Sequence, residues 1–318
     1  MTDFFNDGTR DEPKPQVWLN LDSLHDLRPG SRWPEELNAQ PAERGGRFAA
    51  DGFEGVQLTR ESGPASPVLP HCGLDRISEP AKAEAVVARH AEAGKRCLTV
   101  HVGWGWEDDA SADRLVEAVL AASQRHRLPV FIETHRATIT QDVWRTVRIV
   151  RSFPGIRFNG DFSHYYCGQE LAYGAWPARL AGLAPIFERV GFLHGRIASS
   201  CCMQVPIDPD WATRPRLACG HADYLAHFRD LWTGTMRGFL RSAAPGGCAG
   251  FCARIAFACL PLRAGFPPRV RLSPGGKRSL RAGADLPAAG ARLLRRGAAR
   301  AARRRAKGKD PRSKLRGI

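Results

Sequence analysis

The 318-residue sequence contains no run of about 18 apolar residues, so we expect no membrane-spanning helix. Residues 1–15 are polar and acidic and lack the apolar core of a secretory signal. The nine cysteines follow no small-domain disulfide framework, and Cys201 and Cys202 are too close together for the usual zinc-knuckle spacing. We therefore expect a cytoplasmic protein whose cysteines are mostly buried, reduced thiols that do not bind metal.

Phosphate-binding motifs are also absent. No GxGxxG follows the first predicted strand and GxxxxGK[ST] occurs nowhere, so nucleotide-binding folds with a doubly wound sheet lose support. Residues 267–318 contain no aromatic side chain on which a nucleic-acid base could stack. We therefore expect no base-specific binding of nucleic acid.

Positive charge is confined to one end of the chain. The whole sequence has a formal charge of +15, but residues 241–318 alone hold 20 Lys and Arg against two acidic residues. Residues 1–240 hold 27 Lys and Arg against 30 Asp and Glu, so the body of the protein is mildly acidic. The basic segment is rich in Arg, Pro and Gly and is expected to be disordered.

Short apolar runs alternate with amphipathic segments along residues 16–243. The runs are bounded by Pro, Gly or polar residues, which is typical of buried parallel strands. Helices are predicted where apolar residues recur every three or four positions. The predicted strands are 16–22, 55–59, 69–74, 97–103, 129–135, 157–163 and 191–196. The predicted helices are 44–52, 78–94, one starting at Asp108 or Asp109, 140–153, 180–189 and 221–243.

Seven strands in strict alternation with helices predict a parallel sheet covered by helices. A doubly wound sheet and a closed barrel both fit this alternation. The barrel is favoured because ionisable residues stand at the carboxyl ends of three successive strands, where barrel enzymes assemble their active sites. We therefore predict an α/β (β/α)8 TIM barrel over residues 1–243, with seven recognisable βα units. We expect its eighth strand to be altered or missing and residues 244–318 to form a separate basic tail.

Glu133, Asp161 and His194 end the last three predicted strands. Their separations of 28 and 33 residues each correspond to about one βα unit, which places them around one site. Two carboxylates and an imidazole suit Mn²⁺, Mg²⁺, Co²⁺ or Zn²⁺ better than a thiophilic metal. Contact with substrate and hydrogen-bonded packing both remain open for three flanking histidines. The flanking polar residues are His101, His135, His164 and Arg196.

Three short motifs carry a family resemblance: Phe131-Ile-Glu-Thr-His-Arg136, Gly160-Asp-Phe-Ser-His164 and Leu193-His-Gly-Arg196. Together they resemble the strand-end motifs of the xylose isomerase-like TIM barrel superfamily, in its bacterial sugar phosphate isomerase/epimerase branch, over about residues 14–240. The resemblance implies a divalent metal, with Mn²⁺ as the first choice, bound by Glu133, Asp161, His194 and a second Glu on strand eight. It also implies a small sugar or polyol substrate and a metal-stabilised enediolate. Glu133 would be an acid/base, and Arg196 and His164 would contact the substrate.

The second Glu is missing from the sequence. No glutamate follows Glu188 in the remaining 130 residues. One choice of codons for residues 251–258, read with a one-base shift, gives Phe-Ala-Pro-Glu-Leu-Leu-Ser, which resembles the family's strand-eight motif. A shifted reading frame and a genuine basic extension both remain open, and we favour the first. Without this Glu, the chain as written is expected to bind metal weakly and to show little or no turnover.

Two classes of function remain open. The first is a metal-dependent sugar or sugar phosphate isomerase/epimerase, inactive or nearly so as written. The second is a non-catalytic barrel whose basic tail, with runs such as Arg303–Arg305, binds polyanions non-specifically. Related metal sites also serve abasic-site endonucleases, dehydratases and other lyases, and the acidic body of this chain disfavours an endonuclease. A homo-oligomer is compatible with the sequence.

Overall fold

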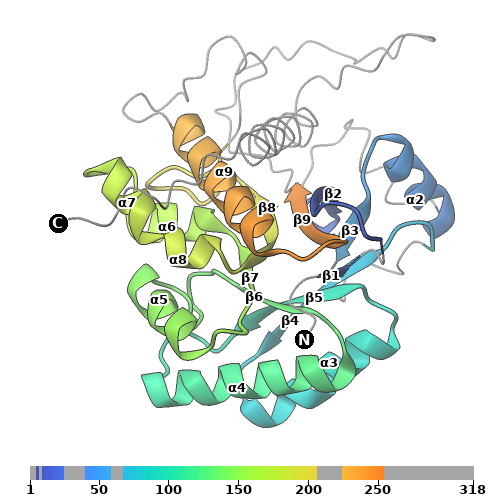
Figure 1. Ribbon diagram of the computed structural model, residues 1–318, viewed down its shortest axis with the longest axis horizontal. Coiled ribbons are helices and arrows are strands. Elements are labelled where there is room, and N and C mark those ends of the chain that lie inside the picture. Colours follow the sequence, from blue (N-terminus) through green and yellow to red (C-terminus); the bar gives the residue numbers. More distant parts are fainter. Residues whose placement is uncertain (1–4, 7–8, 25–39, 59–66, 206–223, 254–318) are drawn as a thin grey trace.

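The computed structural model describes residues 5–6, 9–24, 40–58, 67–205 and 224–253 (Figure 1). The strands are β1 (Phe5–Asn6), β2 (Lys14–Asn20), β3 (Gly55–Leu58), β4 (His71–Ile77), β5 (Cys97–Val102), β6 (Val130–Glu133), β7 (Phe158–Gly160), β8 (Val190–Gly195) and β9 (Gly247–Ala253). The α-helices are α2 (Pro41–Ala50), α3 (Ala83–Glu92), α4 (Asp109–His126), α5 (Val143–Ser152), α6 (Phe162–Gly168), α7 (Trp176–Gly182), α8 (Ala184–Phe187) and α9 (Tyr224–Ser242). Two short 3-10 helices are η1 (Asp22–Leu24) and η2 (Pro80–Lys82).

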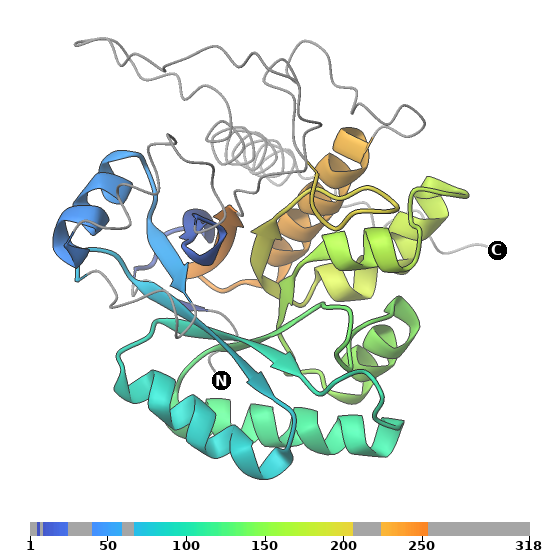
Figure 2. The same cartoon turned by 180° about the vertical axis from the view of Figure 1, so that it is seen from behind.

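Eight of these strands close into a barrel. Strands β2 to β8 pair in parallel with their neighbours in chain order, and β9 pairs in parallel with both β8 and β2. The two-residue β1 is added antiparallel to β9. The α-helices lie around the outside of the strands, as Figure 1 and the rear view in Figure 2 show. This arrangement is an α/β TIM barrel and confirms the predicted fold class.

The closing strand corrects the predicted domain boundary. Strand β9, orange in Figure 1, lies within the segment that the sequence pattern assigned to the tail. The sequence predicted an eighth strand that is altered or missing. The strand is present, its described part carries no glutamate, and the barrel continues past residue 243 to Ala253. Burial of Phe251 and Cys252 accounts for the pairing, because both side chains are removed from water on the two faces of the strand. Residues 254–318, with their predicted disorder and polyanion contacts, lie outside the described residues.

Local capping moves the ends of two predicted elements. The strand predicted over 157–163 ends at Gly160, because the Asp161 carboxylate caps α6 by accepting from the Ser163 backbone N–H at 3.2 Å. The helix predicted from Thr140 begins at Val143, where Asp142 accepts from the Arg145 backbone N–H at 2.7 Å. This cap turns the Asp161 backbone away from the direction of the strand, at the carboxyl end of the barrel.

The barrel interior changes from apolar to polar along its axis. Trp18, Phe131 and Phe192 form a buried apolar cluster together with four cysteines. Two residues further along the same strands, the interior side chains are polar, as the spacing of two residues per strand face requires. These fully buried polar side chains are Asn20, Gln57, Thr99, Asn159 and His194.

Helix α9 packs so closely against α8 that only glycine fits at position 238. A Cβ added to Gly238 would stand 2.4 Å from the carbonyl oxygen of Phe187, whereas a Cβ added to Gly46 in α2 would meet nothing within 4 Å. Alanine is favoured over glycine inside a helix by about 1 kcal/mol. We therefore expect Gly46→Ala to raise the free energy of unfolding by about 0.5–1 kcal/mol, and Gly238→Ala to lower it by roughly 1–3 kcal/mol. Urea unfolding measures both, and equal stabilisation by the two changes would contradict this packing.

Two further expectations concern the cysteines, predicted to be mostly buried thiols, and the absence of a membrane-spanning helix. The seven cysteines among the described residues are free, and four of them are buried. No helix in this part of the chain is both long and apolar enough to span a membrane.

Candidate metal centre

The three predicted metal ligands, here called the trio, meet at the carboxyl end of the barrel. Glu133 ends β6, Asp161 follows β7, and His194 lies in β8. The Nδ1 atom of His194 is 3.1 Å from Asp161 Oδ2 and 3.5 Å from Glu133 Oε1. All three side chains are buried, and together they form a group that could hold a metal ion.

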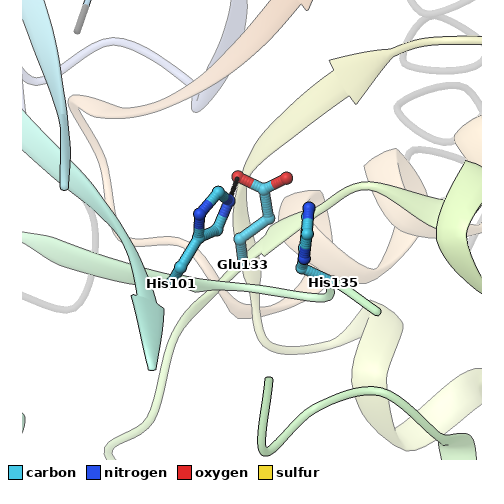
Figure 3. A group of neighbouring side chains, drawn as sticks. All are labelled: His101, Glu133 and His135. Atoms are coloured by element: carbon cyan, nitrogen blue, oxygen red, sulfur yellow. Dashed lines mark ion pairs between the residues drawn. The ribbon is translucent and has the colours of Figure 1, made fainter. Parts of the chain in front are cut away.

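Three more histidines surround the Glu133 carboxylate. His101 Nε2 lies 3.1 Å from Glu133 Oε2, and His164 Nε2 lies 3.9 Å from Glu133 Oε1. The rings of His101, His135 and His164 form a row, with centroids 4.2 Å and then 3.9 Å apart. Figure 3 shows the rings of His101 and His135 beside the Glu133 carboxylate, and these three residues form a second group with metal-ligand geometry.

Several buried polar atoms in this cluster have no well-directed hydrogen bond. Within the described residues this holds for both oxygens of Glu133 and both ring nitrogens of His164. Glu133 is 0% exposed and His164 is 1% exposed, so bulk water does not solvate them. A buried polar group without a hydrogen bond costs roughly 1–3 kcal/mol, and a buried charge costs more. These atoms are therefore poised for a partner that accepts several lone pairs at once.

The distances fit a divalent cation as that partner. Two ligand atoms that each bond one metal at about 2.1 Å lie about 3.0–3.4 Å apart in octahedral or tetrahedral geometry. The contacts of His194 Nδ1 with the two carboxylates, 3.1 and 3.5 Å, are close to that range. Two carboxylates and an imidazole can therefore converge on one ion. The donor types suit a hard or borderline metal such as Mn²⁺, Mg²⁺, Co²⁺ or Zn²⁺.

Electrostatics keeps both carboxylates ionised. Burial by itself would raise the pKa of Glu133, but the charges of the nearby His194 and His101 rings outweigh it and hold that pKa well below its ordinary value. Burial would likewise raise the pKa of Asp161, but the Arg196 guanidinium, 3.5 Å away, and the neighbouring His164 lower it further than burial raises it. Both groups are thus acceptor-only at neutral pH, as metal binding requires.

Two imidazoles of the row are held neutral. Burial lowers the pKa of His164 from 6.5 to about 4, although the nearby carboxylates oppose the shift. Burial and the His164 ring together lower the pKa of His135 from 6.5 to about 3. At neutral pH both rings therefore offer lone pairs and do not carry a positive charge.

These low pKa values predict a loss of stability in mild acid. Between pH 6.5 and 4 the unfolded chain protonates its His164 imidazole while the folded protein does not, so the free energy of unfolding falls as the pH falls. At about 1.36 kcal/mol per unit of pH, His164 alone removes about 2 kcal/mol between neutral pH and pH 5. The two carboxylates add little above pH 5, because their ordinary pKa values of 4.5 and 3.8 keep them largely ionised in the unfolded chain as well.

Urea unfolding of metal-free protein at pH 7.5 and pH 5 measures this loss. His164→Gln is expected to flatten the dependence on pH, whereas His126→Gln, in α4 and outside the site, is not. An unchanged slope in the His164 variant would contradict a neutral buried imidazole.

The closing strand brings no carboxylate to the site within its described part. The register of β8 and β9 places Cys252 directly beside His194, and the other residues from Gly247 to Ala253 carry no ionisable oxygen. The expected fourth ligand is thus absent from the described strand. His164 Nε2 lies 3.7 Å from Asp161 Oδ2 and 3.9 Å from Glu133 Oε1, which makes it a further donor close to both carboxylates.

A polar layer beneath the trio was not predicted from sequence. Gln57 of β3 and Asn159 of β7 both contact His194 Nε2, at 2.8 and 2.9 Å. Each is a single polar residue inside a short, otherwise apolar strand, and that is the signal by which they could have been found. Arg196, expected to contact substrate, is buried beside Asp161.

Comparison with known proteins gives similarity to solved structures alone. No protein-family model matches the chain, and no curated protein matches it. It is similar to a putative sugar phosphate isomerase/epimerase from Anabaena variabilis, with TM-score 0.47 and 9% identity over 90% of this chain and 99% of that one. It is also similar to 3-keto-D-glucoside 4-epimerase from E. coli, with TM-score 0.44 and 13% identity over 89% and 99%. A D-allulose 3-epimerase from Methylomonas sp. gives TM-score 0.44 and 10% identity over 77% and 85%.

All three are named as sugar isomerases or epimerases. At these identities and TM-scores the similarity carries no argument about the function of this chain. The barrel itself rests on the strand pairing, and function must be inferred from the residues of the site.

Proposed function

We propose that this barrel is a metal-dependent isomerase or epimerase of small sugars or sugar phosphates. The observation that carries the proposal is the buried Glu133 carboxylate, which receives no well-directed hydrogen bond within the described residues and lies against His194 and Asp161. Glu133, Asp161 and His194 would hold the ion, and Mn²⁺ is the first choice. The bound ion would supply positive charge that stabilises an enediolate.

The residues around the ion have separate tasks in this proposal. Glu133, kept ionised by its neighbours, accepts the proton from the carbon next to the substrate carbonyl. Arg196 lies 3.5 Å from Asp161 Oδ2 and would also contact a substrate oxygen. The rings of His101, His135 and His164 would orient hydroxyl groups of the substrate.

A second acid/base on the opposite face of the substrate is absent from the described closing strand. Removal and return of a proton by Glu133 alone exchanges hydrogen with solvent but leaves the configuration unchanged. We therefore propose slow solvent exchange with little or no net isomerisation or epimerisation for the chain as written.

Deuterium exchange tests this proposal. Metal-free protein is loaded with Mn²⁺ in D₂O and incubated with ketohexoses and with dihydroxyacetone phosphate, and incorporation next to the carbonyl is followed by NMR. Exchange that requires both Mn²⁺ and Glu133 is the expected result. No exchange with any substrate, or equal exchange by Glu133→Gln protein, would overturn it.

The charge of +18 on residues 241–318 favours one second function, polyanion binding by a non-catalytic barrel. Retention on heparin that falls when Arg303, Arg304 and Arg305 are replaced by Gln, in a protein without metal affinity, would favour it. Cytoplasmic location and oligomeric state remain predictions from sequence.

A further inference from the structure

A chain of buried amides connects the end of β2 to the face of His194 that points away from the two carboxylates. Asn20 Nδ2 is 2.9 Å from Gln57 Oε1, and that oxygen is 2.8 Å from His194 Nε2. All three side chains are at most 1% exposed, so bulk water cannot replace any of these contacts. The other end of the Gln57 amide is also engaged, because its Nε2 donates to Thr99 Oγ1 at 3.2 Å.

The direction of every hydrogen bond in this chain follows from one backbone group. The Ser23 backbone N–H can only donate, so the Asn20 atom that it contacts at 2.9 Å must be the oxygen. The Asn20 nitrogen is then left to face Gln57, and the Gln57 atom that it contacts must be the acceptor Oε1. Since Oε1 can only accept, the His194 Nε2 beside it must carry a proton.

The same chain of hydrogen bonds also determines what His194 Nδ1, on the opposite side of the ring, can offer to a cation. His194 Nδ1 lies 3.1 Å from Asp161 Oδ2, a hydrogen bond in which Nδ1 donates as long as no cation lies between the two atoms. Because Nε2 keeps its proton, a cation that replaces the Nδ1 proton receives the Nδ1 lone pair. An imidazole that binds metal needs this arrangement, in which the distant nitrogen donates to a fixed acceptor. Asn159 fits as well: exchanging its two amide atoms gives its Oδ1, otherwise without a partner among the described residues, a donor in His194 Nε2.

We propose that Asn20 and Gln57 are positioning residues that fix the tautomer of His194 and so direct its Nδ1 lone pair at the cation site. The proposal deepens the proposed function and rests on it for the identity of the ligand. The relay itself does not need a bound ion, because it operates in the metal-free protein.

The substitution Asn20→Asp tests the relay without touching the metal centre. The new carboxylate still accepts from the Ser23 N–H but cannot donate, so the Gln57 amide turns its nitrogen toward it. His194 Nε2 then faces a donor and no longer carries a proton. Gln57→Met removes the acceptor without adding a charge and is expected to have the same effect. Gln57→Glu keeps an acceptor and is the matched control.

Two measurements read the outcome. NMR of protein with ¹⁵N-labelled histidine, in mildly alkaline buffer without metal, shows which nitrogen of His194 is protonated, with His194→Gln identifying the signal. Titration with Mn²⁺ gives the affinity. His194 Nε2 is expected to carry a proton in the wild-type and Gln57→Glu proteins and to lack one in the Asn20→Asp and Gln57→Met proteins, whose Mn²⁺ affinity is lower by about 10–100-fold.

A proton that stays on His194 Nε2 in both the Asn20→Asp and Gln57→Met proteins, each shown to be folded by circular dichroism, would overturn the relay. If wild-type protein binds no Mn²⁺, the proposed function fails, and the tautomer measurement still decides the relay. The two failures are thus distinguishable.

Discussion

Replacing Glu133 with Gln is expected to weaken Mn²⁺ binding at least about a hundredfold and to abolish metal-dependent solvent exchange of substrate hydrogen. The loss should exceed the 10–100-fold typical of residues that only support a ligand, because Glu133 is itself a ligand in our account. The amide is similar in size to the carboxylate but is neutral and has only one acceptor atom. Isothermal titration and the deuterium-exchange assay together measure the effect.

The matched control is Glu117→Gln, on the exposed face of α4. It removes the same charge from the protein at a site away from the cluster and should leave Mn²⁺ affinity unchanged. A Glu133→Gln protein that binds Mn²⁺ as tightly as the Glu117→Gln protein would show that the buried carboxylate is not a ligand.

Replacing Phe251 with Ala is expected to lower the free energy of unfolding by about 3–5 kcal/mol. Phe251 lies in β9, is fully buried, and packs edge-to-face on Trp232 of α9 with ring centroids 5.4 Å apart. Its ring also fills the space beside Gly195 of β8, where an added Cβ would stand 2.7 Å from the ring. The ring therefore joins the closing strand to the helix that covers it, and its loss leaves a cavity at the barrel seam.

Trp106→Ala provides the comparison, because this large aromatic side chain is 94% exposed. Its removal should change the free energy of unfolding by no more than about 0.5 kcal/mol. If Phe251→Ala were as mild, residues 247–253 would belong to the tail and the barrel would lack its eighth strand. Urea unfolding of the two variants distinguishes these cases.

Sequence periodicity predicted the strands whose burial is continuous. Residues 97–102 alternate Leu98, Val100 and Val102 on the helix-facing side with Cys97, Thr99 and His101 on the other, and both sides are largely buried. The closing strand was missed because Gly247 to Ala253 consists mainly of small residues, whose strand propensity is weak. Its stability comes from pairing on both edges with β8 and β2, and sequence patterns do not register such tertiary contacts.

The candidate site, like the fold, was predictable from the sequence only in part. Glu133, Asp161 and His194 could be grouped because the carboxyl ends of parallel strands converge, and the structure brings them together. Gln57 and Asn20 could not be grouped with them. They lie far apart in sequence, and their role depends on which way each amide is turned. That orientation is fixed by the Ser23 backbone N–H, a group that no sequence motif marks.

Titration of metal-free protein with Mn²⁺, followed by the electron paramagnetic resonance signal of the free ion, shows whether Glu133, Asp161 and His194 form a metal centre. Saturable binding of one ion per chain is expected, and this binding should be weak because the described closing strand supplies no fourth ligand. Glu133→Gln and Asp161→Asn are each expected to remove this binding. Wild-type protein that leaves the free-ion signal as high as the two variants do would contradict the assignment of this cluster as a metal centre.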